Sequence, residues 1–148
     1  MTGNLVSYTL DSTLASVDKA EDAARHFASD AGFPGDAIDG IAMAVREAAV
    51  NAVLHGNAYD PAKKVMLEFD RAAQDLVITI RDQGAGLEEA QIPNPLAPEN
   101  LLKTSGRGIF LMRTFMDEVR IRNSQPGTEV TLIKHAGGRS SGAKEGSK

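Results

Sequence analysis

Three short clusters of polar and glycine residues lie in fixed order along an otherwise apolar chain. They are Glu47-Ala-Ala-Val-Asn51, Asp82-Gln-Gly-Ala-Gly86 and Gly106-Arg-Gly108. The first offers a carboxylate suited to general-base chemistry and an amide oxygen suited to a hard cation such as Mg2+. The second offers an acid with two glycines, and the third offers backbone N–H groups for an anion. Together the three clusters predict a nucleotide pocket.

Glu47 and Asn51 are one helical turn apart, so both lie on one face of the helix expected from Asp36 to Gly56. The apolar stripe of that helix lies on another face and consists of Val45, Ala48, Ala52 and Val53. A solvated helix surface would show the same polar stripe. Asn51 counts against this alternative, because Asn is a modest helix former where Lys or Glu would serve a solvated face better.

Asp82 directly follows an apolar run, residues 76–80, that is expected to be a buried strand. A buried carboxylate here would accept a hydrogen bond from the exocyclic amine of adenine, a contact worth about 1.5 to 3 kcal/mol. Gly84 and Gly86 let the backbone turn sharply and approach a ligand. An ordinary turn shares this pattern. A calcium loop does not, because it needs further acidic ligands at alternate positions and a closing Glu.

Gly106 and Gly108 precede the helix expected from Gly108 to Met116, so nearby amide groups would form an anion site. Neighbouring side chains that would add donors are Lys103, Thr104, Ser105 and Arg107. The segment is not a Walker A loop, which requires Gly-Lys-Ser/Thr, and it lacks the third glycine of a dinucleotide fingerprint. A flexible hinge is the alternative interpretation.

The elements around these clusters predict an α/β (α+β) fold, a two-layer sandwich with helices on one face of a mixed, mostly antiparallel sheet. Two helices are expected before the second cluster, and Asp36 is expected to cap the second of them. The expected order is a strand at 5–10, helices at 12–31 and 36–56, a hairpin of 65–69 with 76–80, a mobile lid at 84–105, a helix at 108–116 and a hairpin of 119–121 with 128–133.

The composition indicates one domain, because the chain has 148 residues and 42% hydrophobic content. We expect that domain over residues 1–135 and a disordered polar tail over 136–148. The net charge of -4 disfavours a nucleic-acid partner, and the lack of cysteine excludes disulfides and thiolate metal sites. Neither a signal peptide nor a membrane-spanning run is visible, so we expect a cytoplasmic protein without a membrane partner.

The three clusters resemble the N, G1 and G2 boxes of the GHKL superfamily of gyrase-type, heat-shock, histidine-kinase and mismatch-repair ATPases, over residues 5–134. Three segments are most similar to the stand-alone anti-sigma-factor serine/threonine kinases of bacterial partner-switching systems. They are Asn51-Ala-Val-Leu-His55-Gly56, Ser105-Gly-Arg-Gly-Ile-Phe-Leu-Met112 and Phe115-Met-Asp-Glu-Val119. Neither the phosphoacceptor module of a histidine kinase nor the transducer domain of gyrase relatives is expected in a chain of this length.

The resemblance implies the Bergerat (histidine-kinase-like ATPase) fold as a single ATP-binding kinase domain, with an ATP lid between the G1 and G2 boxes. It implies ATP and Mg2+ as cofactors, with the cation held through Asn51, a base role for Glu47 and an adenine-binding role for Asp82. The residues that it assigns to nucleotide binding are Asn51, Asp82, Gly84, Gly86, Ser105, Gly106, Arg107, Gly108 and Thr128.

The function implied is that of an ATP-dependent serine/threonine kinase and anti-sigma factor. Glu47 would deprotonate a hydroxyl on a small antagonist protein, and the kinase would also sequester a sigma factor. Two alternatives remain: a nucleotide-binding regulatory module that binds a partner without phosphorylating it, and a simple ATPase with water as the acceptor. The resemblance also implies a homodimer.

Overall fold

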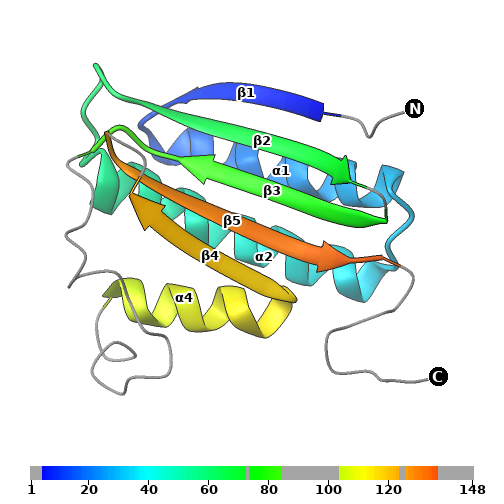
Figure 1. Cartoon of the computed structure of the whole chain (residues 1–148). Helices are drawn as coiled ribbons and strands as arrows, with labels where there is room; N and C mark the ends of the chain where they lie inside the picture. The colour runs from blue at the N-terminus through cyan, green and yellow to red at the C-terminus, as the bar shows by residue number, and fades with distance from the viewer. Residues whose placement is uncertain (1–4, 73, 85–103, 124–125, 137–148) are drawn as a thin grey trace.

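A five-stranded sheet forms one layer of the structure and helices form the other (Figure 1). This computed structural model describes residues 5–72, 74–84, 104–123 and 126–136. The strands are β1 (Leu5–Asp11), β2 (Lys64–Ala72), β3 (Asp75–Arg81), β4 (Glu118–Asn123) and β5 (Thr128–His135), in the spatial order β1-β2-β3-β5-β4. All four neighbouring pairs are antiparallel. The two-layer fold and both hairpins are therefore confirmed, with no parallel pair among the described strands.

Burial alternates along the inner strands β2 and β3, whose buried face is turned toward the helices. Successive side chains of a strand point to opposite faces, so every second residue enters the core. The core residues of the two central strands are Val65, Leu67 and Phe69 in β2, with Leu76, Ile78 and Ile80 in β3. The register pairs Leu67 with Ile80 and Phe69 with Ile78, which stacks these side chains across the ladder.

The helices α1 (Leu14–Asp30), α2 (Gly35–Val50) and α4 (Thr104–Phe115) cover this apolar face (Figure 1). Thr13 caps α1, because its Oγ1 accepts a hydrogen bond from the Ser16 amide. The middle helix, α2, lies between α1 and α4 and packs against both. Its predicted apolar stripe is confirmed, since Val45, Ala48, Ala52 and Val53 are all buried.

The start and the end of the second helix differ from the prediction. Pro34, not Asp36, occupies the N-cap position and makes no side-chain cap hydrogen bond. Asp36 lies in the first turn, where its charge still complements the helix dipole. The last six residues of the expected helix form a π-helix, η1 (Asn51–Gly56). Hydrogen bonds shift there to a longer spacing, as in that of the Asn57 amide to the Ala52 carbonyl at 2.8 Å.

The third cluster also differs from its predicted position. Helix α4 begins at Thr104, so Gly106 and Gly108 lie inside its first turns rather than before it. Glycine is a weak helix former, and here the close packing of α4 on α2 outweighs that preference. Residues 85–103 of the lid expected at 84–105, and residues 137–148 of the tail expected at 136–148, lie outside the described residues. No helix in the described part of the chain is long and apolar enough to cross a membrane.

Candidate nucleotide site

Asp82 lies at the end of β3 and is only 6% exposed. Its Oδ1 accepts hydrogen bonds from the amides of Gly84 at 2.9 Å and Thr128 at 3.1 Å. Its Oδ2 accepts no hydrogen bond from any residue that the structure describes. Burial raises the pKa of this carboxyl, although the two amides act in the opposite direction. Asp82 therefore has one oxygen fixed by two amides and one oxygen without a hydrogen-bond donor among the described residues.

Two glycines leave room for Asp82, and a third lies against the backbone of one of them. A Cβ at Gly56 or at Gly127 would overlap Asp82, and a Cβ at Gly84 would overlap the carbonyl of Gly56. Gly127 also has a φ of 88°, in the left-handed region that favours glycine. Gly84, predicted to approach a ligand closely, also closely approaches the Gly56 backbone. Gly56 and Gly127 were not among the predicted site residues, although Gly56 stands at the expected end of the second helix.

Glu47 and Asn51 lie together on the side of α2 that faces α4. A Cβ at Gly108 would lie 3.1 Å from Glu47 Oε1 and 3.2 Å from Asn51 Nδ2. The structure therefore brings the first and third clusters into direct proximity, as their proposed roles require. Both polar side chains are half-buried, and neither forms a hydrogen bond or ion pair with a described residue.

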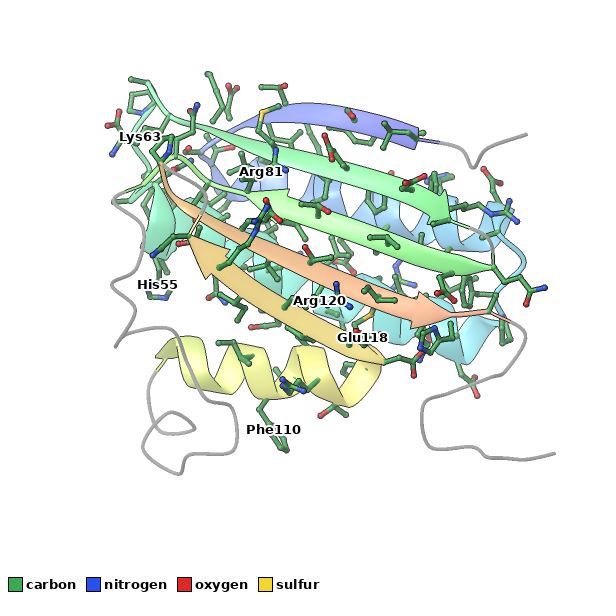
Figure 2. The ribbon with its side chains drawn as sticks, in the orientation of Figure 1. His55, Lys63, Arg81, Phe110, Glu118 and Arg120 are labelled. Atoms are coloured by element: carbon green, nitrogen blue, oxygen red, sulfur yellow. The ribbon has the colours of Figure 1, made fainter. Side chains whose placement is uncertain are left out.

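The π-helix connects the two ends of this site. It begins at Asn51 and ends at Gly56, whose Cα lies against the carboxylate of Asp82. The buried side chains of Ala52 and Val53 anchor it in the core. Such widened turns occur frequently at functional sites, because they redirect side chains within one helix. His55, near the end of the same segment, is exposed (Figure 2).

The remaining predicted site residues are described mainly by their backbone positions. Thr128 begins β5, and its backbone exchanges two hydrogen bonds with Asp82, because its carbonyl also accepts from the Asp82 amide at 3.0 Å. Ser105, Gly106 and Arg107 lie in the first turn of α4, where only their backbone is described. Gly86 lies outside the described residues.

Comparison with known proteins identifies the family of this chain. The family profile of the histidine kinase-like ATPase domain matches residues 10–134. An anti-sigma F factor of Anoxybacillus flavithermus is 39% identical over 105 residues, covering 68% of this chain and 70% of that protein. The serine-protein kinase RsbW of Bacillus subtilis is 32% identical over 117 residues, covering 75% of this chain and 72% of the kinase.

A solved structure supports the fold. The crystal structure of the RsbU and RsbW domains of a Mycobacterium tuberculosis protein matches with a TM-score of 0.66 at 21% identity. The match covers 89% of this chain but 32% of that longer chain, and at this identity it shows the fold alone. The family match and the sequence relatives confirm the resemblance drawn from the three motifs. The chain belongs to the histidine kinase-like ATPase family.

Proposed function

We propose that this protein is an ATP-dependent serine/threonine kinase and anti-sigma factor that phosphorylates a small antagonist protein and sequesters a sigma factor. The two named relatives support this, because each is aligned over more than two thirds of its own length. A site of action in the cytoplasm follows from a sigma-factor partner. We extend the proposal to a homodimer, which sedimentation of the purified protein tests.

The described residues fit the adenine end of ATP. Asp82 Oδ2 is a buried acceptor without a partner in the described part of the chain, and an exocyclic amine supplies the donor that it lacks. Thr128 flanks this position through its backbone. Gly84 and Gly86 contribute to the same end of the pocket.

Glu47, near the end of α2, and Asn51, at the start of η1, support a phosphate end of the pocket. The described residues contain no group of three or more His, Asp and Glu side chains that could hold a metal alone. A Mg2+ ion would therefore take the Asn51 amide oxygen together with phosphate oxygens and water, which is its usual mode of binding beside nucleotides. The first-turn amides of α4, from Ser105 to Gly108, donate to phosphate oxygens at a helix N-terminus.

Bound ATP and Mg2+ supply the transferable phosphoryl group and the neutralisation of its charge. The protein positions the phosphates and the acceptor hydroxyl, and it supplies a general base. Glu47 accepts the proton of the acceptor hydroxyl at one of its carboxylate oxygens, while Asn51 and the α4 amides hold the phosphates in line. The single observation that carries this proposal is that Glu47 and Asn51, both without partners among the described residues, lie together at Gly108.

Replacement of the base tests the proposal. Glu47→Gln is expected to lower phosphate transfer by about 100-fold or more while ATP affinity changes little, because the amide keeps the shape but accepts no proton. The assay is transfer of labelled phosphate from ATP to each small antagonist protein of the same bacterium. Glu68→Gln, a half-buried position on β2, is the matched control and should leave transfer unchanged.

Two outcomes would contradict the kinase reaction. If the wild-type protein binds ATP but forms no phosphoprotein with any antagonist, a regulatory module that uses ATP only as a ligand is the better conclusion. If Glu47→Gln transfers phosphate at the wild-type rate, Glu47 is not the base. Steady phosphate release without any partner would instead indicate a simple ATPase.

A further inference from the structure

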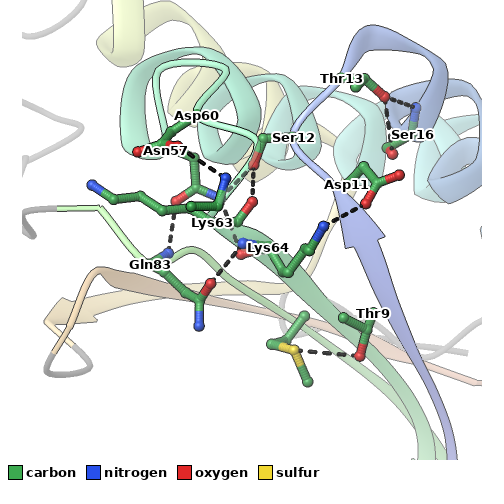
Figure 3. A network of polar contacts seen from close by, with 12 residues as sticks. Thr9, Asp11, Ser12, Thr13, Ser16, Asn57, Asp60, Lys63, Lys64 and Gln83 are labelled. Carbon is green, nitrogen blue, oxygen red and sulfur yellow. Dashed lines mark hydrogen bonds and ion pairs between the residues drawn. The ribbon is translucent and has the colours of Figure 1, made fainter.

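Asn57, the first residue after the π-helix, is a buried polar residue that the three motifs do not include. It is 1% exposed, and both ends of its side-chain amide form hydrogen bonds (Figure 3). Its Nδ2 donates to Ser12 Oγ at 2.9 Å and to the Lys64 carbonyl at 3.0 Å, and its Oδ1 accepts from the Gln83 amide at 2.8 Å. One side chain thus joins the start of α1, the start of β2 and the loop after β3.

The Gln83 contact matters because Gln83 stands between Asp82 and Gly84. The Gly84 amide is one of the two groups that hold Asp82 Oδ1, so the position of the Gln83 peptide sets the orientation of the Asp82 carboxylate. Gln83 is also held by its side chain, whose Oε1 accepts from the Lys64 amide at 2.6 Å. We call the side chains of Asn57 and Gln83, which both bond the Lys64 backbone, the clamp. Asn57 is its buried member, because Gln83 is exposed.

Further hydrogen bonds hold Asn57 and its partner Ser12 in place. The Asn57 amide bonds the Ala52 carbonyl of η1, and the Asn57 carbonyl accepts from the Asp60 amide at 3.0 Å. Its partner Ser12 is 2% exposed and donates in turn to the Lys63 carbonyl. A side chain at this position needs both a donor and an acceptor, since Lys64 offers a carbonyl and Gln83 offers an N–H.

We propose that Asn57 is a positioning residue for base recognition, fixing the Gln83 and Gly84 peptides so that Asp82 Oδ2 is directed at the 6-amino group of a purine nucleotide. The inference rests on the proposed function, because it assumes that Asp82 contacts adenine. It adds that selection of a 6-aminopurine depends on a residue that does not touch the nucleotide.

The test compares two nucleotides that differ only in the amine. ATP and purine riboside triphosphate, which lacks the 6-amino group, are titrated calorimetrically against the full chain. The wild-type protein is expected to bind ATP about tenfold or more tightly than the analogue, the contribution of one hydrogen bond to a charged acceptor. In Asn57→Ala the ratio of the two dissociation constants should fall below about threefold, because the Asp82 carboxylate is no longer held in the orientation that binds the amine.

A purely structural role would give a different result. It would weaken the binding of both nucleotides together and leave their ratio at the wild-type value, and that result overturns the inference while the proposed function stands. If instead the wild-type protein does not discriminate between them, the role of Asp82 in the proposed function is itself wrong.

A second variant decides the question if Asn57→Ala does not fold, as circular dichroism would show. Ser12→Ala removes one partner of the Asn57 amide and keeps its bond to Gln83, so the ratio should fall by about twofold or more. An unchanged ratio in folded Ser12→Ala then overturns the inference. Asp11→Asn is the matched control, because Asp11 pairs with the exposed Lys64 ammonium, whereas Asn57 and Gln83 bond only the Lys64 backbone.

Discussion

Two buried carboxylates at one end of the sheet have opposite surroundings. Asp82, at the end of β3, is held by backbone amides beside the helix layer, and burial raises its pKa. Glu129, on β5, lies among guanidinium groups on the face turned away from the helices. Burial also opposes ionisation of Glu129, but the contacts of Arg122 and Arg81 outweigh it and hold its pKa below the ordinary value.

The difference separates a structural carboxylate from one available for binding. Glu129 is 9% exposed, and its two oxygens contact Arg81 Nε at 3.1 Å and Arg122 Nε at 3.2 Å. Arg81 lies on the sheet face away from the helices (Figure 2). No described cation forms an ion pair with Asp82, and its Oδ2 remains without a hydrogen bond. A buried acid that is stabilised only in part is a candidate for function, because a ligand supplies the missing donor.

Exchanging each acid for its amide tests this distinction and should give the largest effect. Asp82→Asn is expected to weaken ATP binding by about 10- to 100-fold, because an amide donor can then face the donor of adenine. Glu129→Gln should leave ATP affinity within about twofold and instead lower the free energy of unfolding by about 1 to 2 kcal/mol. Calorimetric titration and urea unfolding measure the two quantities. Equal ATP affinities for Asp82→Asn and wild type would remove the distinction.

The sequence predicted most of the fold, because its periodicities report burial directly. Runs of strand-forming residues bounded by turns identified the strands of both hairpins, and the helical stripe around Val45 identified the central helix. Glu47, Asn51 and Asp82 could be predicted as site residues because each stands at a recognisable position in such an element. The structure places Glu47 and Asn51 together beside Gly108, as their helical spacing predicts.

The parts that could not be predicted depend on contacts between distant segments. The bond from Asn57 to Ser12 spans 45 residues, and no local pattern marks it. The π-helix follows from a shift in backbone hydrogen bonding, which leaves no residue signature of its own. Helix α4 starts at Thr104, four residues before the predicted start, and its packing on α2 is a contact between distant segments that no local pattern shows.

A second test of the difference between Asp82 and Glu129 fills the space that glycines leave around Asp82. Gly56→Ala would push a methyl group into the Asp82 carboxylate, so it should lower the free energy of unfolding by about 1 to 3 kcal/mol and weaken ATP binding as well. Gly35→Ala is the control, since a Cβ there meets nothing within 4 Å at the start of α2. Urea unfolding measures the difference. A Gly56→Ala protein with wild-type stability and ATP affinity would show that the carboxylate is not held where the structure places it.

The smallest effect expected is a pair of opposite pH dependences in the protein without nucleotide. Asp82 has a raised pKa in the folded state, so its protonated form stabilises the fold at low pH and this contribution is lost as pH rises through that pKa. Glu129 has a lowered pKa, so its stabilisation is present above the pKa of an unfolded glutamate and is lost as pH falls through its folded pKa. Urea unfolding of wild type and both amide variants between neutral and acidic pH measures this. At neutral pH, Glu129→Gln should have a lower free energy of unfolding than wild type and Asp82→Asn a higher one. Both differences should shrink on acidification. The same sign for both would mean that Asp82 is stabilised as an ion in the free protein, and its free oxygen would then need no ligand.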